Sequence, residues 1–149
     1  MNKILRGLGG GDTSVIDEEQ KTRSIGLAEE DLTGEIIDAA MSVHRELGPG
    51  LLESAYQVSM SHELTLRGIP FQSQVEIPVE YKGVRLDCSY RPDLLVDKRV
   101  VVELKSIERF QPVHEAQLIT YLRLSGVHVG LLINFNVPVL RRGIVRRIL

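Results

Sequence analysis

The segment Val100–Lys105 constrains the fold more than any other stretch of this sequence, because an apolar strand there ends in two opposite charges. Successive side chains of a β-strand point to opposite faces of the sheet. Glu103 and Lys105 therefore share one face, while Val102 and Leu104 point to the other. The sequence predicts an acid and a base as neighbours on one face of an otherwise apolar strand.

The register of the preceding hairpin decides whether Asp93 joins this pair. A two-residue turn at residues 97 and 98 would place Asp93 opposite Val102, whereas a three-residue loop over residues 97–99 would place it opposite Glu103. Residues directly opposite each other have Cβ atoms roughly 4.5–5.5 Å apart, and two like charges there repel unless a positive group lies between them. Only the second register builds a site, and the sequence leaves both registers open.

A divalent cation with Lys105 beside it would satisfy both carboxylates. Hard oxygen ligands favour Mg²⁺ or Mn²⁺ over zinc, which prefers the His and Cys side chains that are sparse here. In the mechanism this predicts, Asp93 and Glu103 hold the metal, the metal lowers the pKa of a bound water, and Lys105 positions that water or stabilises charge on a scissile phosphate. Glu53, set among apolar residues of a helix, is a third candidate ligand, direct or through water.

The expected elements follow the order α-α-β-β-β-α-β. Hydrophobic periodicity and turn residues predict helices over about 31–47, 51–66 and 112–125, and strands over 71–81, 84–96, 100–104 and 127–135, with a short last strand over 144–149. The first three strands are expected to form an antiparallel meander. The strand over 127–135 is apolar enough to be covered on both faces. The predicted fold class is α/β (α+β), with a mixed central sheet flanked by helices.

Composition fits one domain over residues 31–149, preceded by a polar, glycine-containing segment over 1–30 that we interpret as a flexible arm. The formal charge of −2 lacks the basic bias of a protein that binds DNA tightly on its own, so a homo-oligomer or a protein partner is expected to supply affinity. Cys88 is a lone cysteine and no apolar run reaches the length of a membrane span, which favours a cytoplasmic protein without membrane contact.

Two motifs in this order resemble a known superfamily. Pro92 and Asp93, nine intervening residues, and then Glu103-Leu104-Lys105 resemble the signature of the PD-(D/E)XK nucleases, whose α-β-β-β-α-β core matches the expected element order. Gln117 and Tyr121, four apart on the next helix, resemble the Q-x-x-x-Y motif of the branch that contains RecB-type nuclease domains and phage lambda-type exonucleases.

Residues 50–56, Gly-Leu-Leu-Glu-Ser-Ala-Tyr, are similar to the G-x-x-E-x-x-Y motif that names a family of small bacterial proteins in the same superfamily. Residues 131–135, Leu-Leu-Ile-Asn-Phe, also fit that family's pattern. The resemblance implies a restriction-endonuclease-like fold, Mg²⁺ or Mn²⁺ as cofactor, and nucleic acid as partner. Its implied site residues are three metal ligands, one catalytic lysine and two helix groups near substrate: Glu53, Asp93, Glu103, Lys105, Gln117 and Tyr121.

Two classes of function follow. The first is a metal-dependent nuclease that hydrolyses phosphodiester bonds of DNA, with RNA as a weaker alternative. The second is a non-catalytic or partner-dependent nucleic-acid-binding accessory module on the same fold. Each motif also has a structural interpretation: an E-x-K strand often carries only a surface ion pair, and Glu53 could answer a helix dipole. The joint order and strand parity of the motifs favour the nuclease.

Overall fold

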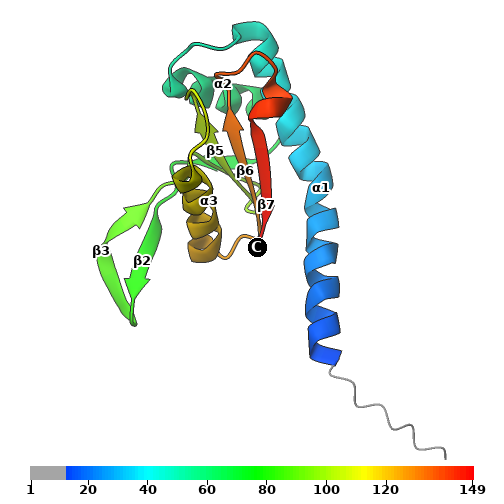
Figure 1. The fold of residues 1–149 in the computed structure, drawn as a ribbon, viewed down its shortest axis with the longest axis vertical. Helices are drawn as coiled ribbons and strands as arrows, with labels where there is room; N and C mark the ends of the chain where they lie inside the picture. Colours follow the sequence, from blue (N-terminus) through cyan, green and yellow to red (C-terminus); the bar gives the residue numbers. More distant parts are fainter. Residues whose placement is uncertain (1–12) are drawn as a thin grey trace, which may run out of the picture.

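The structure, a computed structural model, describes the backbone of residues 13–149 and the side chains of residues 29–149. A five-stranded sheet in the order β1-β4-β5-β6-β7 forms its centre. Its strands are β1 (Phe71–Ser73), β4 (Leu94–Val96), β5 (Val100–Lys105), β6 (Val129–Asn134) and β7 (Ile144–Ile148). A separate two-stranded sheet, β2 (Ile77–Tyr81) with β3 (Val84–Tyr90), forms a hairpin that projects from the body (Figure 1).

The central sheet is mixed. β5 and β6 run parallel, joined by the crossover helix α3 (Pro112–Ser125), and every other neighbouring pair is antiparallel. All six residues of β6 are buried, as expected for an apolar strand with both faces covered. The mixed sheet flanked by helices, and the last strand β7, confirm the predicted fold class.

Helices cover the two faces of the sheet separately (Figure 1). α1 (Thr13–Leu47) and α2 (Glu53–Leu66) contribute to the larger core, which takes Val100, Val102 and Leu104 from β5. α3 packs on the opposite face, where it meets Val101. Strand parity therefore places Glu103 and Lys105 on the α3 side, as predicted. A short 3₁₀-helix, η1 (Leu140–Gly143), precedes β7.

The expected three-stranded meander is wrong. The stretch predicted as one strand over 71–81 divides at Gln74, whose φ of 53° turns the chain out of the strand, so that β1 and β2 belong to different sheets. The stretch predicted over 84–96 divides before Pro92, which has no N–H to donate to a neighbouring strand. The chain thus leaves the central sheet after β1, forms the β2–β3 hairpin, and returns as β4.

The first helix also differs from the prediction, because α1 begins at Thr13 rather than near residue 31. The segment before residue 31 has many good helix formers but no sustained apolar period, and the predicted start near residue 31 rests on such a period. Residues 1–12, part of the expected flexible arm, lie outside the described residues, and the arm's flexibility stays a prediction. Within residues 13–149, no helix is both long and apolar enough to cross a membrane.

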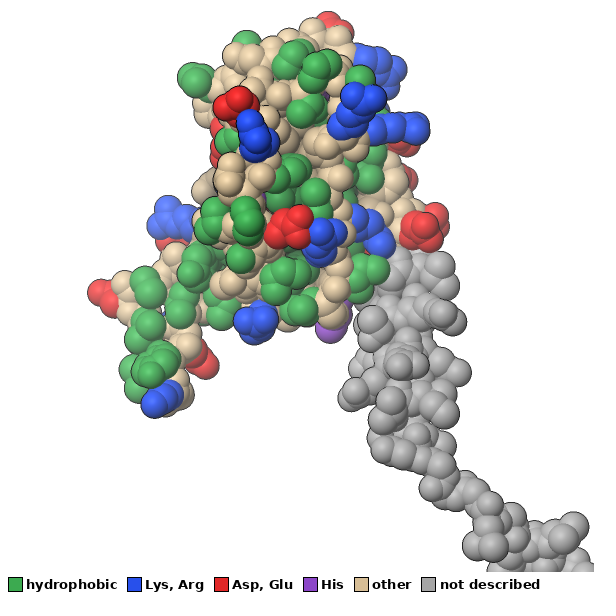
Figure 2. Space-filling model, viewed as in Figure 1, with side chains coloured by type: hydrophobic (Ala, Val, Ile, Leu, Met, Phe, Trp, Pro, Cys, Tyr) green, Lys and Arg blue, Asp and Glu red, His purple; other side chains and the backbone are tan. Residues whose placement is uncertain are grey.

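The β2–β3 hairpin carries apolar side chains on its surface. All seven residues of β3 are exposed, and the large hydrophobic side chains include Tyr81, Val84 and Leu86. Figure 2 shows hydrophobic side chains gathered over this projecting hairpin. The hairpin leads directly into the segment that contains Asp93, so it adjoins the candidate site.

Candidate active site

The loop between β4 and β5 has three residues, which decides the register. Val96 pairs with Val100 and Leu94 pairs with Val102, so the next position back along β4 brings Asp93 opposite Glu103. The loop is closed by a hydrogen bond from the N–H of Arg99 to the carbonyl of Val96, over 2.9 Å. Of the two registers left open by the sequence, the structure has the one that brings the two carboxylates together.

Asp93 is buried, with 8% of its surface exposed. Two groups donate hydrogen bonds to its carboxylate, and the charge of Lys105 is close enough to affect its pKa. The backbone N–H of Leu104 donates to Oδ2 over 2.8 Å, and the side-chain amide of Gln74 donates to Oδ1 over 3.4 Å. Burial raises the pKa of Asp93, while the Leu104 hydrogen bond and the charge of Lys105 lower it. Burial is the larger effect, so the carboxylate is held in an environment that disfavours its negative charge.

Glu103 is still more buried, with 5% of its surface exposed. Its Oε1 accepts a hydrogen bond from the backbone N–H of Asp93 over 2.9 Å, and its Oε2 lies 4.0 Å from Nζ of Lys105. Burial, followed by the charge of Asp93, raises the pKa of Glu103 to about 8. The single ammonium of Lys105 does not compensate for two adjacent buried carboxylates.

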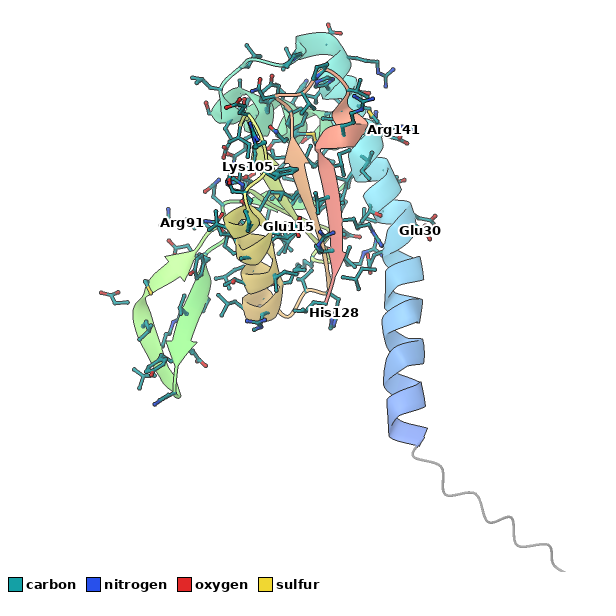
Figure 3. The ribbon with its side chains drawn as sticks, in the orientation of Figure 1. Glu30, Arg91, Lys105, Glu115, His128 and Arg141 are labelled. Atoms are coloured by element: carbon teal, nitrogen blue, oxygen red, sulfur yellow. The ribbon has the colours of Figure 1, made fainter. Side chains whose placement is uncertain are left out.

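Glu53 comes to the same site from the first turn of α2. Burial raises its pKa, Lys105 lowers it and Asp93 raises it further, so Glu53 lies within electrostatic reach of both groups. Figure 3 places Lys105 at the end of β5. The structure thus brings Glu53 toward the β5 residues, and its role as a metal ligand stays a prediction.

Tyr121 faces the carboxylates from α3. It is 9% exposed, and burial raises its pKa to about 12, with further contributions from Glu103, Asp93 and Tyr90. The ring of Tyr90 meets it edge-on, with centroids 5.3 Å apart, so the base of the hairpin closes over this part of the site. Gln117 lies one turn earlier on α3 and is half-buried.

Gln74 makes a contact to Asp93 that the sequence patterns do not predict. It sits 19 residues before Asp93 in the chain, in the irregular segment after β1, and its backbone N–H also donates to the Asp93 carbonyl over 3.2 Å. No periodic pattern marks such a residue, because its position depends on the antiparallel pairing of β1 with β4.

The donor set fits a hard divalent cation. Asp93 and Glu103 offer neighbouring carboxylate oxygens. Burial and then the charge of Asp93 raise the pKa of Glu103, and a bound cation would favour its charged form. Within the described part of the chain, no three Asp, Glu, His or Cys side chains are gathered closely enough to form a complete ligand set. Magnesium commonly takes one or two carboxylates and completes its shell with water and substrate phosphate, so two adjacent carboxylates suffice for that mode of binding.

The fold and the site together define a restriction-endonuclease-like α/β domain with paired carboxylates and a lysine at one strand end. The family model described as the PD-(D/E)XK nuclease superfamily matches residues 30–148, so the chain belongs to this superfamily. No curated protein and no solved structure gives a significant match to the chain.

Proposed function

We propose that this protein is a Mg²⁺- or Mn²⁺-dependent nuclease that hydrolyses phosphodiester bonds of DNA, with residues 31–149 as its nuclease domain. One observation carries the proposal: the buried carboxylates of Asp93 and Glu103 lie opposite each other, with the Lys105 ammonium 4.0 Å from Glu103. The G-x-x-E-x-x-Y motif at residues 50–56 and the Q-x-x-x-Y motif at 117–121 support placement near those two groups of the superfamily.

In this proposal Asp93 and Glu103 hold the cation, and Glu53 adds a contact, direct or through water. When bound, a divalent cation supplies a water of lowered pKa and polarises a phosphate oxygen. Glu103 must give up its proton to serve as a ligand, because its pKa of about 8 leaves much of it protonated near neutral pH. The surrounding protein keeps both carboxylates oriented through the backbone N–H groups of Asp93 and Leu104.

Lys105 would stabilise the negative charge that develops on the phosphate. Its strand ends with the ammonium 4.0 Å from Oε2 of Glu103, while Oε1 accepts the backbone N–H of Asp93. Tyr121 keeps its proton, because its pKa is raised to about 12, and its hydroxyl would donate to a phosphate oxygen. Gln117, one turn away, would contact the substrate beside it.

DNA affinity is expected to depend on more than this chain. The formal charge of −2 gives little long-range attraction for a polyanion. A second copy bound to the same DNA, or a protein partner, would supply the missing affinity. We expect the protein to act in the cytoplasm.

The test is cleavage of labelled linear and circular DNA, single- and double-stranded, with Mg²⁺ or Mn²⁺. Lys105→Ala should abolish cutting, whereas Lys82→Ala, an exposed lysine in the turn between β2 and β3, should leave it unchanged. Calorimetry should show that both variants still bind Mn²⁺, because the carboxylates remain. Asp93→Ala should lose both Mn²⁺ binding and cutting.

Two outcomes would contradict the proposal in different ways. A protein that binds Mn²⁺ but cuts no substrate would be the nucleic-acid-binding accessory module on a nuclease-like fold. A protein whose Asp93→Ala variant behaves like wild type toward Mn²⁺ would have no metal site at these residues.

A further inference from the structure

Hydrogen bonds connect the turn after β5 to the loop before α2. The hydroxyl of Ser106 donates to the carbonyl of Leu51 over 2.6 Å. In the same loop, the Tyr56 hydroxyl donates to the carbonyl of Gly48 over 2.5 Å and accepts from the N–H of Leu51 over 3.2 Å. The loop that leads into Glu53 is therefore held from the β5 side and from within α2.

The other side of the same turn is held by the end of β6. Asn134 is 2% exposed and pairs with Lys105 in the parallel β5–β6 register. Its Oδ1 accepts from the N–H of Ile107 over 3.1 Å, and its Nδ2 donates to the Ile107 carbonyl over 2.9 Å. The N–H of Phe135 donates to the Lys105 carbonyl over 2.9 Å. These bonds fix the backbone on both sides of Ser106.

Aromatic stacking closes the connection into a ring. The Tyr56 and Phe135 rings stack with centroids 4.5 Å apart and 7° between their planes. Phe135 is thus connected to the loop before α2 in two ways. The first connection runs through Asn134, which bonds Ile107 next to Ser106, and through the bond from Ser106 to Leu51. The second is the ring contact between Phe135 and Tyr56. Residues of two sequence motifs, the one at 50–56 and the one at 131–135, meet in this ring.

The start of α2 has no side-chain cap of its own. Leu52 occupies the N-cap position and supplies no side-chain hydrogen bond. Helix starts usually gain a side-chain acceptor there, and without one the first turn relies on contacts from outside the helix. Glu53 is the first residue of that turn.

We propose that Ser106 is a positioning residue that fixes the loop before α2 to the turn after Lys105, and so sets Glu53 beside Lys105. The Ser106 hydroxyl acts on Glu53 and Lys105 indirectly. It bonds the carbonyl of Leu51, two residues before Glu53. The proposal rests on the proposed function only for its effect on metal binding, since the geometry of Glu53 and Lys105 can be measured without metal or DNA.

The matched pair Ser106→Ala and Ser106→Thr separates positioning from a general loss of stability. Threonine keeps a hydroxyl that can reach the Leu51 carbonyl, and alanine removes it. Ser59→Ala is the control, because the Ser59 hydroxyl donates to the Ala55 carbonyl within α2 itself, over 2.7 Å.

The first measurement is the NMR signal of the Lys105 side-chain methylene next to the ammonium, in the metal-free full chain. Glu53→Gln should shift this signal in wild type and in the Ser106→Thr and Ser59→Ala backgrounds. In the Ser106→Ala background the shift caused by Glu53→Gln should fall to less than half. An equal shift in all four backgrounds would overturn the proposal, whatever the protein does to DNA.

The second measurement is a double-mutant cycle on Mn²⁺ affinity. Loss of one positioning hydrogen bond should weaken binding about three- to tenfold in Ser106→Ala. The same substitution should have little further effect in a Glu53→Gln background, because the residue through which it acts is gone. Additive losses of Mn²⁺ affinity would assign Ser106 a purely structural role and contradict the proposal. A wild type that binds no Mn²⁺ would refute the proposed function, and the NMR result would then decide the positioning role alone.

Discussion

Asp93 and Glu103 orient each other across the β4–β5 hairpin. The N–H of Asp93 donates to Oε1 of Glu103 over 2.9 Å, and the N–H of Leu104, next to Glu103, donates to Oδ2 of Asp93 over 2.8 Å. Each carboxylate is thus held by the backbone of the strand opposite. The second oxygen of each carboxylate faces a side chain. Oε2 of Glu103 faces the Lys105 ammonium, and Oδ1 of Asp93 accepts from the Gln74 amide. Backbone groups cannot change rotamer, so the carboxylates keep their orientation without a bound cation.

The raised pKa of Glu103 predicts a pH-dependent stability. Its pKa is about 8 in the folded chain against 4.5 ordinarily, so between these values the folded form keeps a proton that the unfolded chain has lost. Stability of the metal-free protein should therefore fall as pH rises from about 4.5 to about 8. Glu103→Gln should flatten this fall and make the protein more stable than wild type at pH 8.5, by at least about 1 kcal/mol.

Urea unfolding at several pH values checks this prediction. Glu108→Gln is the matched control, since the side chain of Glu108 is exposed, and it should follow the wild-type curve. Added Mn²⁺ should stabilise wild type at pH 8.5 more than Glu103→Gln, because binding to the folded form shifts the equilibrium. A Glu103→Gln variant that loses stability at pH 8.5 would show that the buried carboxylate is already compensated.

Gln74→Ala tests the contact from Gln74 to Asp93, which hydrophobic periodicity does not predict. The Gln74 amide is 3.4 Å from Oδ1 of Asp93, a weak hydrogen bond, so its loss should reduce Mn²⁺ affinity or cleavage about two- to fivefold. Gln72→Ala, an exposed glutamine on β1, should change neither quantity. Equal effects of the two substitutions would exclude a specific role for Gln74.

Gly130→Ala tests how closely α3 must approach the sheet. A Cβ at this position on β6 would lie 2.7 Å from Cδ1 of the buried Leu118, so the Leu118 side chain, the helix or the strand has to move. Overpacking of this kind costs about 1–3 kcal/mol, and thermal unfolding should show a lower Tm. Gly34→Ala in α1, where a Cβ meets nothing within 4 Å, should instead leave the Tm unchanged or raise it.

Tyr121→Phe tests the proposed substrate contact from α3. The ring would keep its packing against Val101 and Leu118, so the fold should be preserved, while the hydroxyl near the carboxylates is lost. We expect a higher KM or a lower kcat for DNA cleavage by about tenfold, with Mn²⁺ affinity unchanged. The control is Tyr81→Phe on the exposed hairpin, which should cut like wild type. Reduced Mn²⁺ affinity in Tyr121→Phe would assign the hydroxyl to the metal instead.

Two features could be predicted from the sequence because they depend on local rules. They are the alternation of side chains along β5 and the motifs that carry the candidate site residues. A strand alternates its side chains whatever its neighbours are, so Glu103 and Lys105 had to share a face. The part of α1 before residue 31 and the break at Gln74 could not be predicted from those rules, since no apolar period marks either of them.

The sequence alone determined which residues are chemically able to form the site, the strand parity that pairs Glu103 with Lys105, and the class of fold. The tertiary structure decided what local patterns leave open: the three-residue loop that brings Asp93 opposite Glu103, and the approach of Glu53 from α2. The physical reason is distance along the chain. Alternation and helical period act over a few residues, whereas register and the docking of a loop are set by the packing of segments far apart in the sequence.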